Sequence, residues 1–205
     1  MFKSIDDIYT LSGKDFSKED LELLTDKDFD FCKNFHESRR EEYLVSRALL
    51  QKILKQIGVL HPFIEKGTNR EPKWPKKVCG SISHSKGCVL VGISQKYKSI
   101  GIDIEHKNRV KENLYRKLFS KKEIEIINKN GVVYADILFS AKEAFYKMQY
   151  PLTKQYLDFL DIELDFYNDQ LHVSYIAKDI IKLETIKPLI IEEDSELVGC
   201  LSLGN

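Results

Sequence analysis

The apolar residues between positions 37 and 57 recur at helical spacing, which predicts one long helix over this segment. Ser38 stands at the start of the pattern and is the expected N-cap. Arg39, Arg40 and Arg47 fall among the polar positions of the same pattern. We therefore expect the three arginine side chains to face solvent.

Short apolar runs bounded by turn residues predict a series of strands. Residues 88–94 form an almost continuous apolar run, which is typical of a buried strand. A turn at 84–87 should join this run to a strand at 80–83. Ser120 and Glu123 have the spacing of a capping box, which predicts a helix start. Further strands are predicted at 98–105, 160–166, 171–176, 183–191 and 197–203, and a further helix at 133–149.

This mixture of helices and strands predicts an α+β fold. Glycine and proline gather at 58–75 and separate a helical stretch from a strand-rich one. The apolar segments 88–94 and 197–203 are alike, and each closes a stretch of helix followed by strands. The chain would then divide into two α+β halves of about 100 residues each. Two unrelated buried strands would show the same likeness, so the repeat alone does not establish that the two halves are similar.

Composition and charge narrow the class of protein. The 205 residues are 42% hydrophobic and 31% charged, as in soluble globular proteins. Lys+Arg and Asp+Glu both number 32, and this zero net charge argues against a nucleic-acid binder. The four cysteines include no Cys-x-x-Cys pair, so neither a zinc site nor a disulfide framework is expected. The acidic N-terminus and the lack of an apolar run of about 20 residues predict a cytoplasmic protein without a membrane span.

Isoleucine alternates with Gly101, Asp103 and Glu105 over residues 100–105. On a strand, the isoleucines would share one face and the two carboxylates the other. Neighbouring carboxylates repel each other unless a cation or a proton lies between them, and such oxygen ligands suit Mg²⁺. Gly101 lies on the acidic face and leaves room there for a close neighbour. An edge strand with its acids in solvent fits the same pattern.

The predicted helix at 133–149 places Glu143 and Lys147 one turn apart, where their side chains are neighbours. An apolar stripe on the same helix consists of Leu138, Ala141, Phe145 and Met148. An ordinary exposed ion pair, which contributes little to stability, is the alternative interpretation of the two charges.

Residues 80–87 read Gly-Ser-Ile-Ser-His-Ser-Lys-Gly. Hydroxyl, imidazole and backbone N–H groups in such a segment can bind a phosphate. The glycine pattern of a P-loop or of a dinucleotide fold is absent from it. A polar turn without a ligand is the alternative.

In this order and spacing, the motifs together resemble those of the 4′-phosphopantetheinyl transferase superfamily. The resemblance is to its monomeric, two-lobed branch, typified by the surfactin and enterobactin enzymes, and extends over roughly residues 37–203. Residues 81–85 resemble the family's strand-turn motif, 101–105 its metal strand and 139–147 its lysine helix. Residues 69–75 and 119–123 resemble the segments that come before and between these motifs.

The resemblance implies a fold of two similar lobes related by pseudo-two-fold symmetry, with domains 1–98 and 99–205 and an active site at their interface. It implies transfer of the 4′-phosphopantetheine arm of coenzyme A to a serine of an apo acyl, peptidyl or aryl carrier protein. Adenosine 3′,5′-bisphosphate would be released. The expected metal is Mg²⁺, with Mn²⁺ as an alternative. Phosphoryl-type transfer of this kind depends on in-line positioning and charge neutralisation.

Carried over residue by residue, the family's metal ligands fall on Asp103, Glu105 and Glu143. Glu123 is the first candidate for the general base that takes the serine proton, and Glu143 is the second. The charge environment of each carboxylate is not readable from the sequence, so the choice between them stays open.

The resemblance also implies residues that bind the phosphates of coenzyme A. Lys142 and Lys147 would hold the pyrophosphate and stabilise developing charge. Arg70, Ser83 and His84 are expected at the 3′-phosphate, and Arg40 and Arg47 are further phosphate candidates.

We expect a monomer that binds coenzyme A and an acidic carrier protein, with no nucleic acid and no membrane as partner. Basic and apolar residues near 110–135 would dock the carrier, including Lys111, Arg116, Lys117, Lys121 and Lys122. The residues do not specify siderophore, nonribosomal peptide, polyketide or fatty acid synthesis. Two alternatives remain: a Mg²⁺-dependent nucleotide or coenzyme A hydrolase, and a non-catalytic coenzyme-A-binding module.

Overall fold

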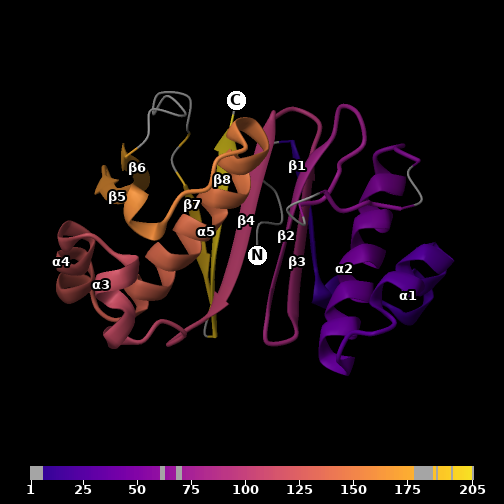
Figure 1. Ribbon diagram of the computed structural model, residues 1–205, viewed down its shortest axis with the longest axis horizontal. Coiled ribbons are helices and arrows are strands. Elements are labelled where there is room, and N and C mark those ends of the chain that lie inside the picture. Colours follow the sequence, from indigo (N-terminus) through magenta and orange to yellow (C-terminus); the bar gives the residue numbers. More distant parts are fainter. Residues whose placement is uncertain are drawn as a thin grey trace. The chain divides into compact units, whose positions relative to one another are not determined.

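The computed structural model describes residues 7–60, 63–67, 71–177, 187, 189–194 and 196–204. The chain separates into two compact units. The N-terminal unit comprises Phe2–Lys96, and the C-terminal unit comprises Tyr97–Asn205 together with Met1. Both units combine helices with antiparallel strands, which confirms the α+β class (Figure 1). The predicted pseudo-two-fold symmetry between lobes stays a prediction.

The N-terminal unit is a three-stranded antiparallel sheet in the order β1-β3-β2, packed against the long helix α2. Leucine and isoleucine side chains of α2 and valine and isoleucine side chains of β3 form a buried core. The helices and strands are β1 (Ile8–Ser12), α1 (Asp26–Cys32), α2 (Glu37–Gln56), β2 (Cys79–Ser85) and β3 (Cys88–Ser94), with short 3-10 helices at Gly13–Asp15 and Lys18–Leu23.

The hairpin between β2 and β3 fixes the position of His84. Ser85 pairs with Cys88, so only Lys86 and Gly87 form the turn. Both residues have positive φ angles, 45° and 82°, as a two-residue hairpin turn requires. The predicted turn at 84–87 is therefore too long, because His84 and Ser85 belong to β2.

The C-terminal unit contains a second three-stranded antiparallel sheet, in the order β4-β8-β7, and a separate β5-β6 hairpin. The helix α5 packs across β4 and β8 (Figure 1). The strands are β4 (Ser99–His106), β5 (Ile162–Tyr167), β6 (Gln170–Ile176), β7 (Ile190–Glu193) and β8 (Leu197–Gly204). The helices are α3 (Tyr115–Leu118), α4 (Lys121–Asn130) and α5 (Val133–Thr153), with short 3-10 helices η3 (Glu112–Leu114) and η4 (Phe159–Asp161).

Gly101 allows β4 and α5 to approach each other closely. A β-carbon at this position would lie 2.6 Å from the backbone nitrogen of Met148 and still closer to the carbonyl oxygen of Ala144. The close neighbour for which Gly101 leaves room is therefore the backbone of α5. The apolar stripe of α5, Leu138, Ala141, Phe145 and Met148, is fully buried, as its spacing predicted.

Most predicted elements are confirmed within a few residues, and the differences have local causes. The N-cap of α2 is His36, and its side chain makes no capping bond, so the assignment of Ser38 is wrong. The capping box of Ser120 and Glu123 is present at the start of α4. Residues 183–186 of the predicted strand 183–191 lie outside the described residues. The sequence pattern did not predict β1 and α1.

Within the described residues, no helix is both long and apolar enough to cross a membrane. None of the four cysteines, all of which lie in the described part of the chain, forms a disulfide bond, and Cys200 on β8 lies directly opposite Asp103 in the β4-β8 register.

Candidate active site

An ion pair between Asp103 and Lys147 joins β4 to α5. Lys147 Nζ donates to Asp103 Oδ1 at 2.7 Å and to the carbonyl oxygen of Ile102 at 3.1 Å. The Asp103 side chain is 6% exposed, whereas that of Lys147 is 30% exposed. A partly exposed ammonium thus holds an almost buried carboxylate, and the same ammonium remains accessible to a ligand.

Glu143 lies one helical turn before Lys147 and shares the electrostatic environment of the β4 acids. Burial raises the pKa of Glu143, the Lys147 ammonium opposes this rise, and the Asp103 and Glu105 carboxylates add to it. The three carboxylates are therefore near enough to repel one another. Glu105 also forms a 3.8 Å ion pair with Arg109.

The carboxylates near α5 suit Mg²⁺ by their chemistry. Among the residues that the structure describes, no three His, Cys, Asp or Glu side chains are grouped closely enough to hold a metal ion by themselves. Mg²⁺ does not need such a cage, because it keeps several waters and binds one or two carboxylates together with substrate phosphates. Burial, and in addition repulsion from Asp103 and Glu105, raises the pKa of Glu143, and a bound cation would offset that repulsion.

Lys142 and Glu123 form a second ion pair of the C-terminal unit, and it is fully buried. Lys142 Nζ lies 2.8 Å from Glu123 Oε2, and both side chains are 0% exposed. Burial raises the pKa of Glu123 and lowers that of Lys142, while their mutual attraction opposes both shifts. Because neither group reaches the surface, this geometry does not support the expected roles of Glu123 as general base and of Lys142 as phosphate ligand, and both roles stay predictions.

The N-terminal unit gathers positive charge along one face of α2. Arg39, Tyr43 and Arg47 are spaced four residues apart, so their side chains follow one another along this face. Arg39 Nη1 contacts His84 Nε2, and Glu42 lies 3.2 Å from Arg39 and 3.3 Å from His84. The sequence prediction included His84 but chose Arg40, whose side chain is exposed on a neighbouring face of the helix.

Arg47 is buried, which contradicts the expectation that it faces solvent. It is 3% exposed, and its guanidinium lies 4.9 Å from the centre of the Tyr43 ring. Among the described residues, Arg47 Nε and Nη1 have no hydrogen-bond partner. Lys66 Nζ lies 5.9 Å from the same ring and 4.5 Å from that of Phe31. Two cations thus flank one aromatic ring, an arrangement that attracts an anionic ligand.

The remaining phosphate candidates are not part of this group of cations. Ser83 is buried within β2 at 3% exposure. Arg70 lies outside the described residues. Arg39 and Lys66 were missed by the sequence reasoning, and only the contacts of Arg39 with His84 and of Lys66 with the aromatic rings identify them.

Two family models match the chain, and together they span most of it. The model described as the 4′-phosphopantetheinyl transferase N-terminal domain matches residues 29–94. The model of the 4′-phosphopantetheinyl transferase superfamily matches residues 99–185. The chain belongs to the 4′-phosphopantetheinyl transferase superfamily, as the resemblance predicted.

Curated relatives of the chain carry names from the same superfamily. The 4′-phosphopantetheinyl transferase PptT of Mycobacterium tuberculosis is 33% identical over 136 residues, 64% of this chain and 60% of that protein. The 4′-phosphopantetheinyl transferase Npt of Nocardia iowensis is 31% identical over 63% of this chain and 60% of its own length. Enterobactin synthase component D of Escherichia coli (strain K12) is 32% identical over 64% of each chain. The similarity therefore spans less than two thirds of each relative.

Among solved structures, the holo-[acyl-carrier-protein] synthase of Thermotoga maritima matches 52% of this chain and 62% of its own, with 21% identity and a TM-score of 0.44.

The raised pKa of Glu143 predicts a pH-dependent effect on stability. Folding favours the neutral form of the Glu143 carboxyl. Above the pKa of the folded protein the carboxyl is charged, and this charge lowers the free energy of unfolding. Below the ordinary pKa of 4.5 the carboxyl is neutral in both the folded and the unfolded protein, so this loss of stability is absent. We expect Glu143→Gln to increase the free energy of unfolding of the metal-free protein at pH 7 and to leave it unchanged below pH 4.5. Urea titrations in a chelator measure this, with exposed Glu125→Gln as control. Equal gains at both pH values would contradict it.

Proposed function

We propose that the protein transfers the 4′-phosphopantetheine arm of coenzyme A to a serine of an apo carrier protein and releases adenosine 3′,5′-bisphosphate. One observation carries this proposal: Lys147, Asp103 and Glu143 come together on β4 and α5 in a chain that belongs to the 4′-phosphopantetheinyl transferase superfamily. The relatives' names, which include phosphopantetheinyl transferases and an enterobactin synthase component, support it.

The residues of the C-terminal unit would supply charge and alignment. One or two of the carboxylates Asp103, Glu105 and Glu143, together with substrate phosphates and water, would hold Mg²⁺, which neutralises pyrophosphate charge when bound. Lys147 would hold a pyrophosphate oxygen with its exposed ammonium while its carbonyl bond to Ile102 keeps the side chain in place.

Glu143 is the carboxylate that we propose as the proton acceptor, since Glu123 is buried. The proton of the attacking serine would pass to Glu143 directly or through one water, and the bond from phosphorus to the leaving oxygen of the bisphosphate would break.

We propose that the cations along α2 bind the 3′-phosphate of coenzyme A. Arg39 and His84 present charged or polar groups at the surface, and Arg47 has guanidinium N–H groups without a protein partner among the described residues. A phosphate offers several acceptor oxygens to such a group of donors. Lys66 would add a third permanently charged side chain to Arg39 and Arg47.

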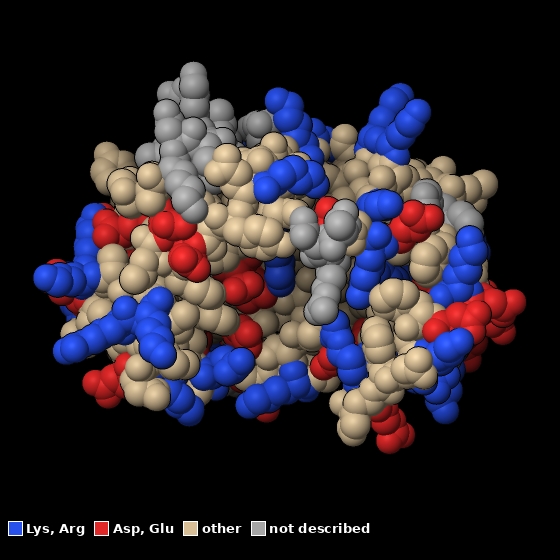
Figure 2. Space-filling model, in the orientation of Figure 1, with Lys and Arg blue, Asp and Glu red and all other residues tan. Residues whose placement is uncertain are grey.

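The carrier protein is proposed to dock over α3 and α4. Basic side chains gather over these helices in Figure 2. A cavity of about 360 Å³ adjoins them, with Val110, Tyr115, Ile127 and Val132 among its lining residues. An apolar side chain of an acidic carrier helix fits such a mixed surface.

We also propose that the enzyme acts as a cytoplasmic monomer with domains 1–98 and 99–205. The two units, Phe2–Lys96 and Tyr97–Asn205, support a domain boundary near residue 97. The cytoplasm is the compartment where coenzyme A and newly made apo carriers occur together.

Intact-mass measurement of apo carrier proteins incubated with this protein, coenzyme A and Mg²⁺ tests the function. We expect a gain equal to one phosphopantetheine arm, and a rate at least about 100-fold lower with Asp103→Asn, because the ligand charge is lost. Exposed Asp30→Asn is the control. Consumption of coenzyme A without any carrier would instead establish a hydrolase, and binding without turnover a non-catalytic module.

The 3′-phosphate assignment is tested by comparing coenzyme A with 3′-dephospho-coenzyme A. We expect Arg39→Met to raise KM for coenzyme A by about 10-fold, because a charge-assisted hydrogen bond is lost, and to leave KM for the dephospho form unchanged. The neighbouring Arg40→Met serves as the matched control and should leave both values unchanged. Equal effects of Arg39→Met on both substrates would contradict the assignment.

The docking surface is tested by charge reversal at exposed positions. We expect Lys117→Glu combined with Lys121→Glu to lower kcat/KM for an acidic apo carrier by about 10-fold or more and to weaken its dependence on salt. KM for coenzyme A should not change. Lys55→Glu, exposed on α2, is the control, and unchanged carrier kinetics in the double variant would exclude this surface.

A further inference from the structure

We propose that Glu123 and Lys142 form a positioning pair, which holds the turn of α5 carrying Glu143 and Lys147 and which does not touch the substrate. The proposal rests on the transfer reaction proposed above. Among the described residues of the C-terminal unit, Glu123 and Lys142 are the most completely buried charged side chains. The proposed positioning role is neither that of a general base nor that of a phosphate ligand.

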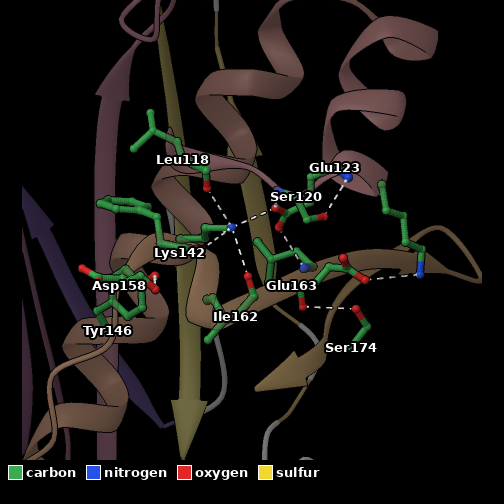
Figure 3. Close-up of polar contacts among 12 residues, drawn as sticks. Leu118, Ser120, Glu123, Lys142, Tyr146, Asp158, Ile162, Glu163 and Ser174 are labelled. Carbon is green, nitrogen blue, oxygen red and sulfur yellow. Dashed lines mark hydrogen bonds and ion pairs between the residues drawn. The ribbon is translucent and has the colours of Figure 1, made fainter. Parts of the chain in front are cut away.

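Four elements, from the two stretches of chain 118–123 and 159–162, meet at the ammonium group of Lys142 (Figure 3). Its Nζ donates to the carbonyl oxygens of Leu118 at 2.9 Å, Phe159 at 2.7 Å and Ile162 at 3.1 Å, and to Glu123 Oε2 at 2.8 Å. These acceptors belong to the end of α3, η4, the start of β5 and the start of α4. An ammonium has three N–H donors, so none is left for a phosphate.

Both carboxylate oxygens of Glu123 are also engaged. Oε2 accepts from the backbone N–H of Ser120 at 2.7 Å, and Oε1 accepts from that of Leu164 at 2.9 Å. The first of these bonds belongs to the capping box of α4, and the second ties α4 to β5. A serine of another protein would have to displace these bonds and enter a side-chain environment with 0% exposure.

The position of Lys142 on α5 explains why this anchoring concerns the site. Lys142 directly precedes Glu143, so the backbone that carries the catalytic carboxylate is fixed by the buried bonds of its neighbour. Two further contacts hold η4 against the same stretch of helix. Tyr146 Oη donates to the carbonyl oxygen of Asp158 at 2.8 Å, and the Phe139 and Phe159 rings are stacked with centroids 5.3 Å apart.

Loss of one member of the pair leaves the other charge buried without its partner, which is strongly destabilising. In Lys142→Met the carbonyl oxygens of Leu118, Phe159 and Ile162 would also lack a donor. The turn of α5 would loosen where it holds Glu143. The signature of a positioning role is therefore a combined change in stability and in metal requirement, without a change in affinity for coenzyme A.

The test compares the full chain with Glu123→Gln and Lys142→Met in holo-carrier formation, well below the unfolding midpoint of each variant. We expect kcat to fall about 3- to 10-fold and half-saturating Mg²⁺ to rise several-fold, with KM for coenzyme A unchanged. The midpoint of thermal unfolding should fall by roughly 10 °C. Exposed residues away from the proposed docking surface supply the controls, Glu22→Gln and Lys18→Met, which should behave as wild type.

Two other outcomes would overturn the proposal. If Glu123 were the general base, Glu123→Gln would lower kcat by about 100-fold or more and leave thermal stability and Mg²⁺ requirement unchanged. A role in stability alone predicts a lower unfolding midpoint with kcat and Mg²⁺ requirement at wild-type values.

Acetylation of lysines in the native wild-type protein tests whether Lys142 is buried and inaccessible, even if the variants do not fold. Lys142 should stay unlabelled with and without coenzyme A and Mg²⁺, whereas Lys147 should be labelled and become protected when both are added. Labelling of Lys142 in the folded protein would overturn the proposal. Absence of transfer by the wild-type protein would overturn the proposed function, while labelling and unfolding would still test the pair.

Discussion

The arrangement of the C-terminal unit depends on how closely α5 packs against β4. Gly101 lets the helix backbone approach the strand, and the Lys147–Asp103 ion pair joins the two elements just beyond this contact. Glu143 then lies near both β4 carboxylates, and its pKa rises as a result of burial and repulsion. A larger residue at 101 would separate the elements and the charged groups together, so packing and chemistry have the same geometric origin.

The sequence predicted helices and strands correctly where a local signal, such as an apolar run or a capping box, marks them. The apolar run at 88–94 and the capping box of Ser120 and Glu123 are purely local signals, and both are present in the structure. Strand β1 was not predictable in the same way, because it exists through its pairing with β3, more than 70 residues away along the chain, and has only one buried residue. Ser38 failed as a cap because the helix begins two residues earlier, after His36.

The sequence predicted the acidic residues of the candidate site, but it predicted the basic residues only in part. Asp103, Glu105 and Glu143 stand in short motifs whose periodicity already places them on defined faces. Burial of a charged residue is different, because it depends on partners from distant segments. Lys142 donates to acceptors in the stretches 118–123 and 159–162, and Arg47 lies against Tyr43. The expectations of a phosphate-binding Lys142 and of a solvent-facing Arg47 did not include this burial. Arg39 was distinguished from Arg40 only by its contact with His84.

The cysteine opposite Asp103 has a consequence for redox chemistry. Cys200 is 0% exposed, and burial raises the pKa of its thiol, so the nucleophilic thiolate is disfavoured. In the reaction proposed above, the protein would bind coenzyme A, which carries a thiol. Because Cys200 is buried and its thiolate is disfavoured, formation of a mixed disulfide and alkylation are both disfavoured at this position.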